Sequence, residues 1–181
     1  INNNPTNNFA TFAATPTNAQ ATFAVDAAGR DGVGGFGMDG QGWDQSFHLE
    51  WPLGWNQDDD EFWSSQLQEL VGIFLVVVQH SPTFKRINIF TDSLPATQAL
   101  HKGFSTKEEP NRVIFNILQQ CQENDCTLCI MWRERDKCNS ARAADLLSRG
   151  LLAQAQKLIP QISVGGFQKL SHKDFQIFTR K

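Results

Sequence analysis

The chain has 181 residues, of which 40% are hydrophobic, and this is enough for one domain with a buried core and flanking tails. Its formal net charge of -3 argues against a simple basic clamp for nucleic acid. The longest apolar run, residues 71–78, is far too short to span a bilayer, so we expect no membrane partner. The chain opens on Ile1 rather than Met, and we therefore expect a fragment of a longer protein.

The N-terminal third of the chain predicts an arm followed by three strands. Residues 1–20 are rich in Asn, Thr and Ala without periodicity, which is typical of a linker or an extended arm. Residues 21–39 predict a β-hairpin, because an apolar strand is followed by a turn around Gly29 and Gly32 and then by a second strand. Residues 46–53 predict a third strand, which a proline ends.

Strands and helices alternate along the rest of the chain. An acidic run at residues 58–61 suits a helix N-terminus, and a long apolar helix is predicted directly after it. Gly103 is placed to close a short helix. The expected helices are residues 62–80, 93–103, 110–124 and 140–158, and the expected strands between them are residues 86–92 and 127–132. Three neighbouring strands followed by this alternation predict an α/β domain with a mixed five-stranded sheet, in the order βββαβαβα, and helices packed on it.

The four cysteines are Cys121, Cys126, Cys129 and Cys138, and the middle two form a C-x-x-C pair of the kind found in zinc sites. These two lie in "CTLCIMW", a stretch that has a strand pattern, and residues three apart in a strand face opposite sides of the sheet. No second such pair and no paired histidines follow in the sequence. We therefore favour reduced thiols over a zinc site and expect an intracellular protein, in the cytoplasm or the nucleus.

Four carboxylates interrupt apolar parts of the predicted elements: Asp26 in the first strand, Glu69 in the first long helix, Asp92 at the end of the fourth strand and Asp145 in the last helix. Taken singly, each has an ordinary explanation as a turn residue, an exposed helix residue, a helix cap or a solvent-facing side chain. Together, strand ends and helix faces can bring all four to one place, where they would repel unless cations lay between them. Carboxylate oxygens are hard ligands that favour Mg²⁺ or Mn²⁺, so the four are candidate metal ligands.

An ordered set of motifs around these acids carries a resemblance to a known family. The motifs are "FAVDAAGRDGVGGFGM", "SSQLQEL", "IFTDS" and "NSARAADLLSRG". Over residues 21–152 the chain resembles the RNase H domain of retroelement reverse transcriptases, of the long-terminal-repeat or tyrosine-recombinase type. The resemblance implies an RNase H-like fold, an RNA:DNA hybrid as substrate, two Mg²⁺ ions that Mn²⁺ can replace, and a flanking reverse transcriptase domain. Residues 153–181 are then a C-terminal extension that either packs on the domain or docks onto a neighbour.

The resemblance also implies catalytic roles for the four acids. Asp26 would bridge both metals, and Asp145 would help to hold the metal that activates the attacking water. Glu69 and Asp92 would hold the metal on the leaving-group side. Two metals about 4 Å apart stabilise both the attacking and the leaving oxygens of an in-line displacement. The expected reaction is cleavage of the RNA strand of the hybrid, which leaves a 5′-phosphate and a 3′-hydroxyl.

Residues beside these acids are candidate substrate contacts. Gln66 matches a position that in relatives contacts the minor groove of the hybrid, and Ser65 beside it is a second candidate. Ser93 follows Asp92 as in the family, although a helix N-cap explains this serine equally well. The basic residues that either contact phosphate or are ordinary solvated charges are Arg133, Arg135, Lys137, Arg142 and Arg149, and we assign Arg133 and Arg142 to substrate binding.

The loop before the last helix departs from the family. Many relatives carry a His there that assists the reaction, whereas residues 133–139, "RERDKCN", contain none. Glu134 or Asp136 can occupy the same space, without an assigned role. A basic protruding helix of some cellular enzymes is also missing. The absent His and the acidic charge balance leave a second interpretation open, in which the chain is a catalytically degenerate or domesticated RNase H-like module that binds nucleic acid or a protein partner.

Two other enzyme classes fit the sequence less well. A transposase or integrase core would place its last acid further from the second Asp than Glu123, which lies late in a predicted helix. A proofreading exonuclease would need an Asp-x-Glu on the first strand, where the sequence has Asp26 followed by two alanines.

Overall fold

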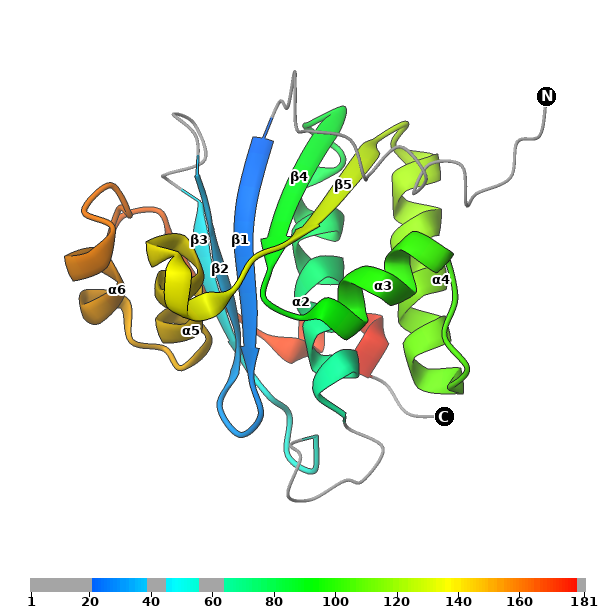
Figure 1. Cartoon of the computed structure of the whole chain (residues 1–181), viewed down its shortest axis with the longest axis horizontal. Helices are drawn as coiled ribbons and strands as arrows, with labels where there is room; N and C mark the ends of the chain where they lie inside the picture. The colour runs from blue at the N-terminus through cyan, green and yellow to red at the C-terminus, as the bar shows by residue number, and fades with distance from the viewer. Residues whose placement is uncertain (1–20, 39–44, 56–63, 179–181) are drawn as a thin grey trace.

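The computed structural model describes residues 21–38, 45–55 and 64–178. The fold is α/β, with a mixed six-stranded sheet in the spatial order β5-β4-β1-β2-β3-β6 (Figure 1). The strands are β1 (Ala21–Ala28), β2 (Gly32–Gly37), β3 (Ser46–Glu50), β4 (Arg86–Thr91), β5 (Thr127–Trp132) and β6 (Phe167–Leu170). The predictions for residues 1–20 and for the acidic run at 58–61 lie outside the described residues.

Strand pairing follows the predicted hairpin and adds one strand. Strands β1, β2 and β3 are antiparallel neighbours, and β4 and β5 continue the sheet in parallel from the other edge of β1. The predicted count of five strands is wrong, because the C-terminal segment supplies β6, which pairs in parallel with β3. Strand β6 has four residues, none of them buried, so no apolar alternation reveals it in the sequence. It forms where the edge of β3 offers backbone partners.

Helices cover both faces of the sheet (Figure 1). They are α2 (Ser65–His80), α3 (Leu94–Lys102), α4 (Glu108–Glu123), α5 (Asn139–Ser148) and α6 (Leu152–Leu158). Helices α2 and α4 pack on one face, and α5 and α6 pack on the other. The alternation of side chains along β1 serves both layers, because Phe23 and Val25 belong to the core under α2 while Ala24 belongs to the core under α5.

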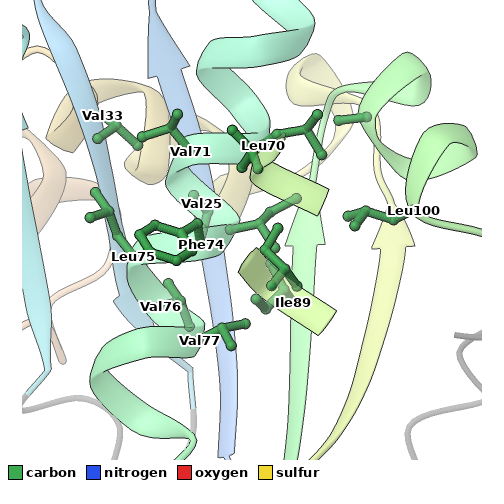
Figure 2. Packing of buried hydrophobic residues seen from close by; sticks show 14 of the residues in the cluster. Val25, Val33, Leu70, Val71, Phe74, Leu75, Val76, Val77, Ile89 and Leu100 are labelled. Atoms are coloured by element: carbon green, nitrogen blue, oxygen red, sulfur yellow. The ribbon is translucent and has the colours of Figure 1, made fainter. Parts of the chain in front are cut away.

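Helix α2 forms the centre of the larger core (Figure 2). Its Leu70 and Phe74 are buried beside side chains of β1 and β4. Gly72 lets the helix approach the sheet closely, since a Cβ there would lie 2.7 Å from methyl carbons of Val25 and Val33. In the part of the chain that the structure describes, no helix combines the length and the apolarity needed to cross a membrane.

Capping residues decide where the helices begin and end. Helix α2 begins at Ser65, three residues later than predicted, because the Ser64 side chain accepts a hydrogen bond from the Leu67 N–H at 3.2 Å. The short helix predicted at 93–103 is confirmed as α3, with Ser93 as its N-cap and Gly103 in the left-handed conformation at its end.

The single last helix predicted at 140–158 is wrong, because the chain breaks into α5 and α6. Gly150 adopts a left-handed φ of 75° between them. Its N–H donates to the Leu147 carbonyl at 3.0 Å, and the next N–H, of Leu151, donates to the Leu146 carbonyl at 2.9 Å. This pair of bonds is the glycine-dependent motif that terminates many helices. The break lets α5 pack on the sheet, and α6 continues beside α5 in another direction.

The C-terminal segment packs on the domain, at least as far as residue 178. Ile177 and Phe178 are buried in the larger core. The Phe178 ring lies 5.5 Å from that of Trp55 and 6.5 Å from that of Trp51, measured between centroids. Of the two roles that the sequence leaves open for this segment, packing on the domain is the one that its described residues adopt.

Candidate metal centre

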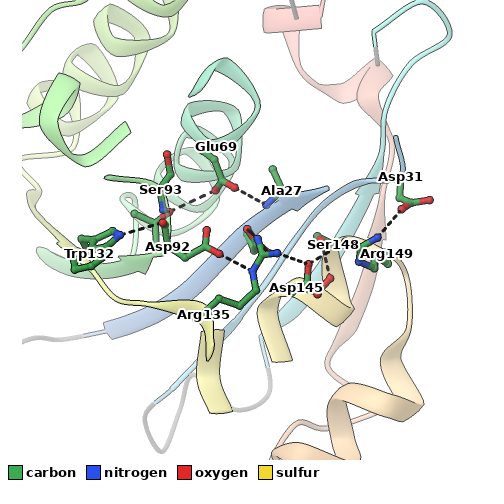
Figure 3. A network of polar contacts seen from close by, with 12 residues as sticks. Ala27, Asp31, Glu69, Asp92, Ser93, Trp132, Arg135, Asp145, Ser148 and Arg149 are labelled. Atoms are coloured by element: carbon green, nitrogen blue, oxygen red, sulfur yellow. Dashed lines mark hydrogen bonds and ion pairs between the residues drawn. The ribbon is translucent and has the colours of Figure 1, made fainter. Parts of the chain in front are cut away.

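Three of the four predicted acids meet at one end of the sheet. Strands β1 and β4 are parallel neighbours, paired in register at Ala24 and Phe90, so their carboxyl ends lie at the same edge. Asp26 lies near the end of β1. Asp92 directly follows β4, and Glu69 projects from the second turn of α2 (Figure 3). One oxygen from each of the three carboxylates lies within 4.8 Å of the other two. We call these three residues the acidic triad.

Glu69 is only 6% exposed, and hydrogen bonds hold its carboxylate in a fixed orientation. Its Oε1 accepts a hydrogen bond from the Ala27 N–H at 3.2 Å, and its Oε2 accepts one from the Thr91 hydroxyl at 3.4 Å. The Thr91 hydroxyl in turn accepts from the Ser93 N–H at 3.1 Å. The strand ends of β1 and β4 therefore both position the carboxylate that α2 contributes.

Asp92 is positioned by its neighbours on β5. The indole N–H of Trp132, at the end of β5, donates to the Asp92 backbone carbonyl at 3.1 Å. The Arg133 N–H donates to the Thr91 carbonyl at 2.9 Å. These contacts extend the β4–β5 pairing past the last strand residue, so the Asp92 side chain projects from a constrained backbone.

Burial and the neighbouring carboxylates raise the pKa values of two members of the triad, Asp26 and Glu69. Burial raises the pKa of the Asp26 carboxyl, Glu69 and Asp92 raise it further, and the Arg135 guanidinium opposes them. Burial also raises the pKa of Glu69, which shares a hydrogen bond with Asp26. Two carboxyl groups this close share a proton unless a cation takes its place.

Arg135, which the sequence named only as a possible phosphate contact or solvated charge, instead contacts the acids. Its Nε donates to Asp92 Oδ2 at 2.6 Å, and its Nη2 donates to Asp26 Oδ2 at 3.2 Å. Its Nη1 lies 3.6 Å from Asp145 Oδ1. Partial burial by itself lowers the pKa of this guanidinium, but the three carboxylates more than offset this and raise it. The available signal was topological, since the loop with Arg135 leaves the carboxyl end of a parallel strand beside β4.

Asp145 lies near the triad but is joined to it through arginine. It projects from α5 with 20% of its side chain exposed. Its Oδ1 lies 3.6 Å from Arg135 Nη1 and 3.4 Å from Arg149 Nη2. Arg149 also pairs with Asp31 at 3.6 Å, which ties the end of α5 to the β1–β2 turn. The four predicted acids thus share one region, and the three of the triad are within ligand distance of one another.

The predicted minor-groove contacts lie at the starts of α2 and α3. Ser65 is the first residue of α2 and is exposed. The Gln66 amide donates to the Pro95 carbonyl at 3.2 Å and so links the first turns of the two helices. The Ser93 hydroxyl accepts from the Ala96 N–H at 3.2 Å, which is the N-cap role that the sequence also allowed.

The two arginines assigned to substrate binding flank the same site and are exposed. The Arg133 guanidinium lies over the Phe90 ring, 3.6 Å from its centroid, and Arg133 lines a small cavity that Asp26 and Asp92 also line. Arg142 donates to the Asp136 carbonyl at 2.7 Å and thereby supports the loop before α5. Glu134 pairs with Lys137 at 2.8 Å, so the loop residue that reaches the acids is Arg135.

The donor set of the triad fits a divalent metal ion. Its three carboxylates are hard oxygen ligands of the kind that Mg²⁺ and Mn²⁺ prefer. They come from three different elements that the sheet and α2 hold together, and Glu69 is oriented by hydrogen bonds from behind. A scan of protein-family models and a search of curated proteins each found no match for this sequence.

Proposed function

We propose that the chain is a metal-dependent endoribonuclease that cleaves the RNA strand of RNA:DNA hybrids, an RNase H-like domain of a retroelement reverse transcriptase. The observation that carries the proposal is the meeting of Asp26, Glu69 and Asp92 within 4.8 Å at the ends of β1, β4 and α2. Such a cluster is costly without a cation, because each buried carboxylate disfavours ionisation of the others. The mixed sheet with helices on both faces is compatible with the fold that the resemblance implies.

The chain's own residues divide into holding, orienting and substrate-facing groups. Asp26, Glu69 and Asp92 would hold one divalent ion, and Asp145 with Asp26 would hold a second. Bound ions of this kind activate a water and stabilise the leaving oxygen in phosphodiester hydrolysis. The Thr91 hydroxyl and the Ala27 N–H would keep Glu69 in its ligating orientation.

Substrate recognition is proposed for residues on the same side of the domain. Gln66 and Ser65 open α2 and Ser93 opens α3, which places polar groups beside the acidic triad. Arg133 and Arg142 would contact phosphates across the loop before α5. A 2′-hydroxyl distinguishes RNA from DNA, so minor-groove contacts near the acids would favour a hybrid over duplex DNA.

The test is a cleavage assay on a hybrid with an end-labelled RNA strand, with Mg²⁺ or Mn²⁺ and with chelator as control. We expect cleavage of the RNA strand with either metal, 5′-phosphate ends on the products, and no cleavage of duplex DNA. Asp92→Asn should abolish cleavage, because an amide is a poor ligand for a hard cation. The charge-matched control Asp136→Asn, on an exposed side chain of the adjacent loop, should retain it.

The Asp92→Asn variant should also remain folded. Its lost repulsion towards Asp26 and its lost ion pair with Arg135 act in opposite directions, so the thermal midpoint in chelator should stay close to that of the wild type. Unchanged cleavage by Asp92→Asn would contradict the site assignment. Equal cleavage of duplex DNA and hybrid would point to a non-specific nuclease instead.

One observation favours a second function, a catalytically degenerate RNase H-like module that binds nucleic acid or a protein partner. Arg135 compensates the charge of Asp26 and Asp92, and a site that no longer held metal would need such compensation. This module would bind the hybrid, or a protein. It would leave the RNA strand intact in Mg²⁺ and in Mn²⁺. Hybrid binding measured beside the cleavage assay separates the two functions.

A further inference from the structure

The Arg135 guanidinium is shared among carboxylates from three separate elements. Its Nη2 contacts Asp26 on β1. Its Nε contacts Asp92 after β4, and its Nη1 lies near Asp145 on α5 (Figure 3). A guanidinium offers five N–H donors in a planar fork, and here all three nitrogens face acids. No other cation in the described part of the chain makes ion pairs with both Asp26 and Asp92.

Arg135 uses oxygens that a metal ion in the triad would also need. Its shortest contacts are to Asp92 Oδ2 at 2.6 Å and to Asp26 Oδ2 at 3.2 Å. An ion ligated by these carboxylates would lie within a few ångströms of the guanidinium, where like charges repel strongly in a partly buried site. The guanidinium and a divalent ion therefore cannot both make their full set of contacts with these carboxylates at the same time.

We propose that Arg135 is an internal counter-cation that competes with divalent metal ions for the acidic triad and has to withdraw when metal binds. The proposal rests on the metal site of the proposed function. Metal affinity would then depend on the attraction of three carboxylates and on the repulsion of one arginine. The domain would bind metal only at an ion concentration high enough to displace the guanidinium. Without metal, the same arginine lowers the repulsion among Asp26, Glu69 and Asp92.

The surroundings of Arg135 allow the side chain to withdraw while the loop stays in place. Its side chain is 40% exposed and belongs to a short 3-10 helix, η3 (Arg135–Lys137). The loop backbone around it is held by the Arg142 bond to the Asp136 carbonyl, and the Glu134–Lys137 pair braces its outer side. A rotation of the long side chain towards solvent therefore suffices, and the backbone of the loop can stay as it is.

The test measures Mn²⁺ binding by calorimetry on the full chain, and thermal unfolding in chelator and in excess Mn²⁺. Arg135→Gln should bind Mn²⁺ about tenfold more tightly than the wild type, because one opposing charge is removed from the site. In chelator the same variant should unfold at a lower temperature, and Mn²⁺ should raise its midpoint by more than it raises that of the wild type. Arg135→Lys, which keeps the charge, should stay close to the wild type in affinity.

The matched control is Lys102→Gln, on an exposed residue at the end of α3, which makes the same change in net charge without touching the triad or the loop that carries Arg135. It should leave Mn²⁺ affinity within about twofold of the wild type. Equal Mn²⁺ affinity in Arg135→Gln and the wild type would overturn the competition, even if both cleave the hybrid and the proposed function stands. Tighter binding by Arg135→Gln without any cleavage would uphold the competition and count against the nuclease. Absence of Mn²⁺ binding by every variant would overturn both.

Discussion

At the residue scale, Asp26 and Asp92 carry the same group in different surroundings. The Asp26 side chain is 2% exposed and lies against Glu69, whereas that of Asp92 is 14% exposed and makes the shortest contact with Arg135. Burial therefore acts mainly on the Asp26–Glu69 pair, whose pKa values are both raised. The pH dependence of the domain should consequently be governed by this pair.

This pair predicts a loss of stability with rising pH in the presence of chelator. The pKa of Glu69 is raised from 4.5 to about 7, so between these values the folded state binds more protons than the unfolded state. The free energy of unfolding then falls as pH rises through this window, by up to about 1.4 kcal/mol per pH unit for each proton. The pKa values of His48, which is buried, and of His80, which is partly buried, are lowered, and these groups contribute the opposite slope in part of this range.

The measurement is therefore the difference between wild type and Glu69→Gln in urea unfolding from pH 4.5 to 7. The amide of the variant has the same shape as the carboxylate and carries no charge. The free energy of unfolding of Glu69→Gln minus that of the wild type should therefore increase as the pH rises from 4.5 to 7. Glu109→Gln, on a partly exposed residue of α4 paired with Arg112, serves as the control, and its stability should run parallel to that of the wild type. A pH-independent difference for Glu69→Gln would contradict the raised pKa.

At the element scale, the position of α5 decides where Asp145 lies. Gly34 of β2 lies opposite Asp26 in the hairpin, and a Cβ there would run into the backbone of Leu147 and Ser148 in α5. The glycine-rich strand therefore lets α5 settle directly on the sheet. Gly150, which follows α5, then ends the helix. Gly34 on β2 thus decides where α5 and its Asp145 lie, and Gly150 decides where α5 stops.

Gly34→Ala should accordingly destabilise the domain by about 1–3 kcal/mol, the usual cost of overpacking a close contact. The methyl group would push α5 off the sheet and move Asp145 away from Arg135, so hybrid cleavage should fall as well. Gly165→Ala is the matched control, because its added Cβ would meet only the Ser163 hydroxyl at 3.7 Å. Urea unfolding of the two variants makes the comparison, and equal stabilities would show that α5 does not need the glycine.

At the scale of the whole molecule, the C-terminal segment joins two distant parts of the domain. Strand β6 extends the edge at β3, while Ile177 and Phe178 return to the core beside Trp51 and Trp55. The Arg112 guanidinium of α4 donates to the Ile177 carbonyl at 3.2 Å. A chain ended after residue 152 would leave the β3 edge unpaired and part of the larger core uncovered.

Phe178→Ala should therefore cost about 3 kcal/mol in the free energy of unfolding, as expected for a buried aromatic side chain. Phe115→Ala on α4 is the control, since that ring is 64% exposed and its loss should change stability by less than about 0.5 kcal/mol. Chemical denaturation followed by tryptophan fluorescence would report both, because Trp51 and Trp55 lie against Phe178. A small effect of Phe178→Ala would indicate that the segment is only loosely attached.

The sequence by itself determined the features that arise from local patterns. Apolar alternation and turn glycines predicted the β1–β2 hairpin, and a serine and a glycine predicted both ends of α3. The acids Asp26, Glu69 and Asp145 lie on the elements that the sequence assigned to them, and Asp92 lies one residue past the end of its strand. Each of these features depends on residues close together in the chain, where propensity and capping act directly.

Only the tertiary structure decided the rest, because it depends on groups far apart in the chain. Strand β6 exists because β3 presents a free edge, and its own four residues carry too little apolar pattern to predict it. Arg135 reaches Asp26 across 109 positions, and no spacing rule connects them. The triad closes because parallel pairing of β1 and β4 aligns their ends beneath α2. Sequence patterning specifies which residues are buried or capped, whereas packing between elements sets which charges meet.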